Sequence, residues 1–352
     1  MIKFFQTADW HITLKTAYGK LRFKYIDKAV YKMGQAAVDR EVDFIVVLGD
    51  MFDSVNPSEE ERDFAGSCLE KLSRHVKVYV IAGNHDSNEM FTAMGSMDKI
   101  KSLGGSNTSR VEFILRPTIK AINGYRIYFL PHRNDIPKKV IKARKKKIDI
   151  LFSHFSVIGG SLSSSNFKMK RWVDPKLLDK FVYTGLGDLH KPQPHYSGSI
   201  GRINFGERKD EKGYLFVTVN KKKYMTEFIK TADLKFVQLN LVNGQLLDSI
   251  NNKPAKNLKG AIAKIRYKGK DRDTIRVYKE KALKRGAREV KIEIIRSKGK
   301  VSKAEKLKRI DYKVPFLNSL QKYLKQDKSL NKIRRKRIFK FVSKVAKAHG
   351  LN

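Results

Sequence analysis

The chain has 352 residues, of which 41% are hydrophobic, so it can bury the core of one large domain and a smaller one and is not a disordered chain. Its single cysteine, Cys68, excludes an internal disulfide, and no apolar stretch is long enough to span a bilayer. The formal net charge of +40 exceeds what solubility requires and predicts a polyanionic partner.

The first predicted element is a strand at residues 2–7, and the sequence Ala8-Asp9-Trp10-His11 follows it directly. Residues two positions apart in an extended segment lie on the same side, so Asp9 and His11 can present an oxygen and a nitrogen to one ligand. Residues 22–42 carry apolar side chains at helical spacing, which predicts an amphipathic helix.

A second strand is predicted at residues 44–48, where five consecutive apolar residues indicate burial on both faces. It ends at Gly49-Asp50, and open α/β sheets bind ligands at the carboxyl ends of their strands. Taken alone, Asp50 is equally well explained as a turn residue that caps the next helix. That helix is predicted to begin at Ser58, with Glu61 completing a capping box.

Three further segments, at residues 76–83, 148–152 and 181–186, repeat the pattern of a strand that ends in polar residues. The polar residues that follow these strands are Asn84, His85 and Asp86, then His154, and finally Asp188 and His190. Strands that alternate with helices in this way predict an α/β fold.

The intervening segments predict other elements. Residues 88–103 predict a helix with a stripe of Met and Phe side chains, and residues 138–147 predict a basic helix. Residues 111–131 predict a hairpin around the turn signal Asn123-Gly124. The Gly- and Ser-rich residues 159–171 predict a loop near the site, and its basic residues are Lys168, Lys170 and Arg171.

The last third of the chain is strongly basic. Residues 251–352 hold 34 lysine and arginine residues against 8 aspartate and glutamate residues, a net charge of +26, whereas residues 1–250 carry +14. A proteome rich in lysine would explain scattered lysines better than this asymmetry. A strand, a helix and a strand are predicted at 261–267, 272–286 and 289–295, with Lys264 and Arg266 on the first strand.

Two helices are predicted within residues 315–349. The second has an apolar stripe at helical spacing, formed by Ile338, Phe341, Val342 and Val345. Such a stripe can dock in a groove of a partner protein or fold back on its own domain.

Seven side chains thus stand at or just after strand ends: Asp9, His11, Asp50, Asn84, His154, Asp188 and His190. Carboxylate, imidazole and amide ligands together suit Mn²⁺, Fe²⁺ or Zn²⁺ better than Ca²⁺. Seven ligands are too many for one such ion and suit two ions that share a bridging carboxylate. Each histidine alone is more simply a core or surface residue, but the ordered set predicts a two-metal site that acts on phosphorus.

The ordered motifs resemble those of the calcineurin-like metallophosphoesterases. They are DxH at Asp9, GDMFD at Gly49–Asp53, GNHD at Gly83–Asp86, His154, and GDLH at Gly187–His190. Within that superfamily the chain most resembles the SbcD-type nucleases, because the run GDLHKPQPHYSGSIGRINFGE is similar to theirs. The resemblance is strong over roughly residues 1–230 and weak over residues 255–300.

The resemblance implies a layered α/β sandwich of two central sheets flanked by helices, with a small α+β capping domain and C-terminal helices. The implied divisions are a nuclease domain at 1–236, a linker and basic capping domain at 237–312, and partner-binding helices at 313–352. The implied activity is Mn²⁺-dependent DNA cleavage, 3′-to-5′ on duplex ends and endonucleolytic on hairpins or single strands. The implied partners are an SbcC-type coiled-coil ATPase and a second copy of the chain, paired through helices at 58–73 and 88–103.

The resemblance also assigns roles by motif position. One Mn²⁺ would be held by Asp9, His11, Asp50 and His190, and the other by Asp50, Asn84, His154 and Asp188, with Mg²⁺, Fe²⁺ or Zn²⁺ as alternative ions. His85 would protonate the leaving oxygen, and Asp86 would orient it. Asp188 departs from the family, whose last motif usually reads GHxH, and this leaves the identity of the second metal open.

Three functions stay open on the sequence. They are a DNA nuclease, another phosphoesterase of the superfamily (a protein phosphatase or cyclic-nucleotide phosphodiesterase), and a DNA-end-binding subunit whose catalysis Asp188 weakens. The basic last third favours a polymeric polyanion, and the candidate DNA contacts are Lys168, Lys170, Arg171, Lys264 and Arg266. The lone cysteine and a start without a signal-peptide pattern predict a cytoplasmic, nucleoid-associated protein of a bacterium or virus, without membrane association.

Overall fold

The computed structural model describes residues 1–16, 18–86, 110–144, 146–161, 173–269, 271–295, 320, 324 and 331–348. The predicted helix at 88–103 and the basic residues Lys168, Lys170 and Arg171 lie outside these described residues. The chain divides into two units, Met1–Ile265 with Asp273–Ile292, and Arg266–Arg272 with Glu293–Asn352.

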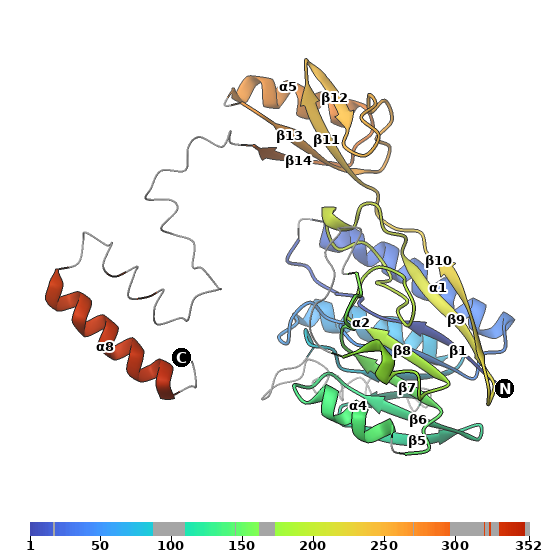
Figure 1. Cartoon of the computed structure of the whole chain (residues 1–352). Helices are drawn as coiled ribbons and strands as arrows, with labels where there is room; N and C mark the ends of the chain where they lie inside the picture. Colours follow the sequence, from blue (N-terminus) through green and yellow to red (C-terminus); the bar gives the residue numbers. More distant parts are fainter. Residues whose placement is uncertain are drawn as a thin grey trace. The chain divides into compact units, whose positions relative to one another are not determined.

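A six-stranded sheet forms the centre of the first unit, in the order β10-β9-β1-β2-β3-β4 (Figure 1). Its strands are β1 (Ile2–Thr7), β2 (Phe44–Leu48), β3 (Lys77–Ile81), β4 (Val111–Ile114), β9 (Gly213–Val219) and β10 (Tyr224–Lys230). Strands β1 to β4 run parallel to one another, whereas β9 is antiparallel to both β1 and β10. The carboxyl ends of β1, β2 and β3 therefore meet at one edge.

A four-stranded sheet in the order β5-β6-β7-β8 packs face to face with the first. Its strands are β5 (Thr118–Ile122), β6 (Tyr125–Leu130), β7 (Ile150–His154) and β8 (Tyr183–Gly187), of which β6, β7 and β8 are parallel. The rings of Phe4 and Phe152 meet edge to face between the two sheets, with centroids 5.2 Å apart. This aromatic layer packs the two sheets against each other.

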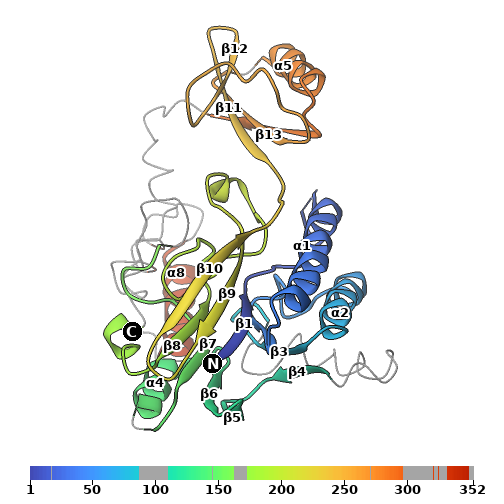
Figure 2. The same cartoon turned by 90° about the vertical axis from the view of Figure 1, so that its right-hand side faces the viewer.

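Helices cover the outer faces of the two sheets (Figure 2). Helices α1 (Gly19–Asp39) and α2 (Glu59–Ser73) bury apolar side chains against the larger sheet, and α4 (Ile136–Arg144) does so against the smaller one. Two short 3₁₀ turns, Pro175–Leu177 and Phe205–Glu207, lie in the connections. The layered sandwich with two central sheets flanked by helices is confirmed.

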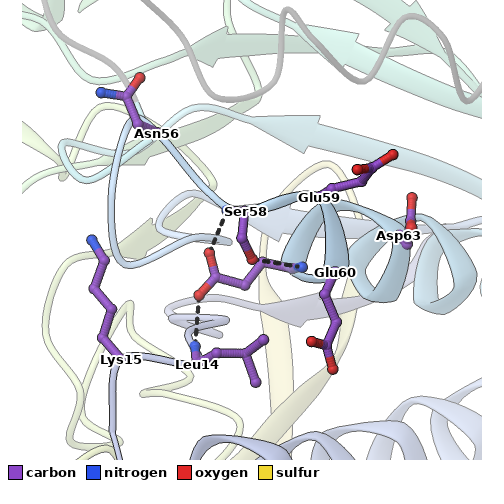
Figure 3. Close-up of a pocket in the computed structure, with 8 residues that line it drawn as sticks. Leu14, Lys15, Asn56, Ser58, Glu59, Glu60 and Asp63 are labelled. Carbon is purple, nitrogen blue, oxygen red and sulfur yellow. Dashed lines mark hydrogen bonds between the residues drawn. The ribbon is translucent and has the colours of Figure 1, made fainter.

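Two local predictions are confirmed at atomic detail. The Ser58 hydroxyl accepts from the Glu61 amide, and the Glu61 carboxylate accepts from the Ser58 amide, which completes the capping box (Figure 3). The same carboxylate accepts from the Leu14 amide at 2.6 Å, so it also ties the loop after β1 to α2. Asn123 and Gly124 have φ values of 48° and 76°, as a type I′ turn between β5 and β6 requires, whereas residues 111–114 of the predicted hairpin form β4, which pairs with β3 in the other sheet.

A third sheet, also of four strands, has the order β12-β11-β13-β14. The predicted strand, helix and strand are β13 (Ile262–Tyr267), α5 (Arg272–Lys284) and β14 (Glu289–Ile294). The sequence prediction missed the hairpin of β11 (Phe236–Val242) and β12 (Gln245–Asp248). In the second unit, α8 (Lys332–Ala348) confirms the last predicted helix, whereas most of the helix before it lies outside the described residues. No helix within the described ranges is long and apolar enough to cross a membrane.

Candidate metal centre

The predicted ligands all follow strands whose carboxyl ends meet at the shared edge of the two sheets. Asp9 and His11 follow β1, Asp50 follows β2 after Gly49, and Asn84 follows β3. His154 ends β7, and Asp188 and His190 follow β8. Residues that are up to 179 positions apart in the chain therefore come within hydrogen-bond distance of one another.

The backbone at this edge is strained. Four of the seven side chains sit on non-glycine residues with positive φ: Asp9 (54°), His11 (43°), Asp50 (49°) and Asp188 (98°). Such conformations cost of order 1–3 kcal/mol each and are characteristic of functional sites. Gly187 is needed for the close approach, because a Cβ there would lie 1.9 Å from the Leu48 carbonyl oxygen.

Asp50 lies at the centre of the cluster. Its Oδ2 is 3.6 Å from His11 Nε2 and 3.4 Å from His154 Nε2, while its Oδ1 accepts from the His85 amide at 2.9 Å. Asp9 joins both halves, because ligand atoms of Asp9, His11 and His190, and of Asp9, Asp50 and His154, lie within 4.8 Å of one another. Asp50 therefore faces both halves of the cluster, a position that suits a carboxylate shared between two ions.

Asn84 and Asp188 complete the half of the cluster around His154. The His154 Nε2 atom is 2.9 Å from Asn84 Oδ1 and 3.9 Å from Asp188 Oδ1. The other oxygen of Asp188 accepts from the buried Ser156 hydroxyl, and the Asp188 amide donates to the Asp9 carboxylate at 3.1 Å. Asp188 therefore has one oxygen held by Ser156 and the other facing His154, and its role as a metal ligand stays a prediction.

His85 lies at the exposed side of the cluster. Its ring centroid is 4.9 Å from that of His11, and its Nδ1 is 3.2 Å from the Asp53 carbonyl oxygen. Asp86 is fully buried, and its carboxylate accepts from the amides of Gly83, Met51 and Phe52. Asp86 thus fixes the loops after β2 and β3 to each other, and its role in orienting His85 stays a prediction.

Three residues that the sequence analysis did not single out contact the cluster. Asp53 Oδ1 is 3.1 Å from His11 Nδ1, Glu207 Oε1 is 2.8 Å from His190 Nδ1, and Lys212 Nζ is 2.9 Å from Glu207 Oε2. Asp53 belongs to the GDMFD motif, which could have pointed to it. Glu207 and Lys212 lie in the charged run RKDEK and its flank, where nothing local marks them.

The burial of the cluster shifts several pKa values. Burial raises the pKa of Asp9 to about 6 against the pull of His190 and His154, and it lowers the pKa of His11 to about 4. Burial also opposes the charge of Asp50, but attraction to His154 and His11 outweighs it and lowers the pKa of Asp50. The penalty on the Asp9 carboxylate is one that a bound cation would offset.

The ring nitrogens provide a direct test of whether a metal fits. The Nδ1 atoms of His11 and His190 each face a carboxylate, so each carries the proton that the carboxylate accepts. In these tautomers the two Nε2 atoms, 3.1 Å apart, are both unprotonated. A divalent cation could then take both nitrogens as ligands, so the residues present fit a metal centre.

Lys264 and Arg266, the two candidate DNA contacts within the described residues, have partners within the protein. The Lys264 ammonium lies over the Phe205 ring, 4.6 Å from its centroid, and Arg266 Nε is 3.6 Å from a Glu293 carboxylate oxygen.

A separate open hollow of about 870 Å³ lies beside the capping box, where the sticks of Figure 3 show Lys15, Glu59, Glu60 and Asp63. None of the seven predicted ligands lines that hollow.

This layered fold, with its cluster of carboxylate, imidazole and amide ligands at the carboxyl edge of two sheets, defines a metal-dependent phosphoester hydrolase. Residues 2–192 match the model of the calcineurin-like phosphoesterase family, and the chain belongs to that family. Similar solved structures include a protein of unknown function from Aquifex aeolicus (14% identity, TM-score 0.25, covering 44% of this chain and 81% of that one). GAP50, the anchor in the inner membrane complex of Plasmodium, is another (14% identity, TM-score 0.36, covering 72% and 86%).

Replacing Asp188 tests whether it is a ligand. Asp188→Ala should weaken Mn²⁺ binding, measured by isothermal titration calorimetry, by at least the 10–100-fold that is typical of losing a residue that only supports a ligand. Asp188→His should keep the ion and shift the preference from Mn²⁺ toward Zn²⁺, because imidazole is the softer ligand. Asp179→Ala, a change at an exposed carboxylate, is the control. Unchanged Mn²⁺ affinity in Asp188→Ala would show that position 188 holds no metal.

Proposed function

We propose that this phosphoesterase is a Mn²⁺-dependent DNA nuclease of the SbcD type, acting 3′-to-5′ on duplex ends and endonucleolytically on hairpins or single strands. The observation that carries the proposal is the charge of the chain that holds the metal cluster. Its net charge is +40, and +26 of that belongs to residues 251–352. A polymeric substrate with one negative charge per phosphate matches such a chain, whereas a small phosphomonoester does not need it.

The chain's own residues divide the work. Asp9, His11, Asp50 and His190 would hold one ion and Asp50, Asn84, His154 and Asp188 the other. A bound pair of divalent ions supplies Lewis-acid stabilisation of the phosphodiester and a more acidic attacking water. Asp86 keeps the Asp50 and Asn84 loops in register through three backbone amides.

In this proposal His85 would act as the general acid. It is exposed, so substrate can reach it, and its amide is held at Asp50 Oδ1, which fixes its backbone to the cluster. In its imidazolium form His85 would donate Nδ1–H to the Asp53 carbonyl oxygen and keep a second N–H, at Nε2, for the leaving oxygen. The proton then moves from His85 to the leaving group as the bond to phosphorus breaks.

The experiment that tests the proposal compares two substrates. Purified full-length chain with Mn²⁺ should release nucleotides from the 3′ ends of duplex DNA and should lose this activity in EDTA. A small aryl phosphodiester should be cleaved with a much lower kcat/KM and with little dependence on salt, because it makes few phosphate contacts. Efficient cleavage of the aryl ester with no DNA cleavage would favour another phosphoesterase of the family. DNA-end binding without cleavage of either substrate would favour a binding subunit.

The proposal extends to an SbcC-type coiled-coil ATPase and to a homodimer. Helix α8 exposes Phe341 to 70% and Ile338 to 36%, which suits docking of its apolar stripe in a groove on a partner. A chain truncated after Lys313 should keep Mn²⁺-dependent cleavage and fail to bind the ATPase.

Light scattering of the full chain at micromolar concentration should give the mass of a dimer, and a monomer would contradict the predicted pairing.

A further inference from the structure

Lys212, which directly precedes β9, has a fully buried side chain. Its Nζ contacts Glu207 Oε2 at 2.9 Å, the His190 carbonyl oxygen at 2.9 Å and Ser199 Oγ at 2.8 Å. An ammonium group has three protons, and these three acceptors use all of them. Lysine is almost never buried so completely unless its charge is paired, and here Glu207 pairs with it directly while the buried Asp210 Oδ2 lies further off, 3.9 Å from Nζ.

Glu207 joins this buried ammonium to the metal cluster. Its Oε2 also accepts from the Ile203 amide at 3.0 Å, and its Oε1 is 2.8 Å from His190 Nδ1. Glu207 is only 2% exposed, so water does not compete for these bonds. His190 is thereby held twice, at its ring through Glu207 and at its carbonyl oxygen directly by Lys212.

We propose that Glu207 and Lys212 are positioning residues that hold His190 in the tautomer and orientation in which Nε2 binds a divalent ion. A carboxylate that accepts from Nδ1–H leaves Nε2 as the bare, ligating nitrogen and raises its basicity. The ammonium of Lys212 fixes the Glu207 carboxylate in place and offsets its charge. This inference rests on the proposed function only in taking His190 as a metal ligand.

A purely structural role makes a different prediction. If Glu207 and Lys212 only tied the connection at 204–212 to the end of β8, replacing them would lower the stability of the metal-free fold. The intrinsic Mn²⁺ affinity would then stay unchanged. The two roles separate when affinity and stability are measured independently of DNA cleavage. A failure of the nuclease assignment would leave the metal measurement intact.

The variant Glu207→Gln keeps the size of the side chain and removes the charge. In the full chain, its Mn²⁺ affinity by isothermal titration calorimetry should fall about 10–100-fold, the usual effect of losing a carboxylate behind a ligating histidine. The double variant Glu207→Gln/Lys212→Met should lose affinity to a similar extent, and it avoids leaving an ammonium buried without its counter-charge. Glu61→Gln is the matched control, because Glu61 is also buried and binds the amides of Leu14 and Ser58 but touches no cluster residue.

Affinity equal to that of the unmutated chain in folded Glu207→Gln, or in the folded double variant, would overturn the inference. So would a loss of affinity equally large in Glu61→Gln. A measurement on the unmutated chain covers the case in which the variants do not fold. In ¹⁵N-histidine spectra recorded in EDTA at alkaline pH, with the His190 signals assigned by their absence in His190→Gln, the proton should sit on Nδ1. A proton on Nε2 would contradict the proposal.

Discussion

Replacing Asp50 with asparagine should abolish detectable Mn²⁺-dependent phosphoester cleavage. Its Oδ2 lies 3.6 Å from His11 Nε2 and 3.4 Å from His154 Nε2, so it faces both halves of the cluster. Asparagine keeps the shape of the side chain and removes the charge that would bridge two cations, so both ions should bind more weakly. Isothermal titration with Mn²⁺ should show loss of the high-affinity phase, and cleavage assays should fall to background.

The control for Asp50→Asn is Asp233→Asn. Asp233 is also a buried carboxylate, which accepts from the Arg202 and Leu234 amides and pairs with Arg202, outside the cluster. The control should keep Mn²⁺ affinity and cleavage within a few fold of those of the unmutated chain. If Asp50→Asn bound two Mn²⁺ ions with unaltered affinity, the bridging role would be wrong.

His85→Ala should slow cleavage by about 10²–10⁴-fold, the usual contribution of a general acid, while Mn²⁺ and DNA still bind. The reason is geometric. His85 presents its ring at the exposed side of the cluster, and its Nδ1 contacts a backbone oxygen, that of Asp53, at 3.2 Å. Single-turnover cleavage rates, measured together with Mn²⁺ titrations, separate the chemical step from binding.

A matched surface change is His75→Ala, which alters a histidine at the end of α2 and should leave the rate unchanged. Added imidazole should restore part of the rate of His85→Ala, because it can enter the space that the missing side chain leaves. A loss of Mn²⁺ affinity in His85→Ala would show instead that His85 ligates the metal.

The residues that sequence patterns predicted best are those whose signals are local. The run Phe44–Leu48 is apolar at every position because Phe44 faces the layer between the sheets while Ile45 faces α1 and α2. Ser58 and Glu61 sit three residues apart, which is the spacing of the capping box they form. Strand ends followed by Asp, Asn or His likewise located the edge at which the cluster assembles.

What the sequence analysis missed was in one case a local signal and in the other a contact between distant residues. The hairpin β11–β12 turns at Asn243-Gly244, with φ values of 45° and 73°, and β11 is apolar at five of its seven positions, so its local signal was present and was overlooked. Glu207 and Lys212 lie 17 and 22 positions beyond His190, in a charged stretch typical of a solvated loop. The fold alone brings Glu207 and Lys212 into the protein interior, where they contact His190.

The separation of His11 from His190 by 179 positions also bears on how the chain folds. Contacts between such remote segments have a high cost in loop-closure entropy and form after the local ones, so the strand-end cluster should be among the last parts to assemble. A cation that recognises only the assembled cluster would then act mainly after the folding barrier. It should lengthen the lifetime of the native state by slowing unfolding, and leave the refolding rate almost unchanged.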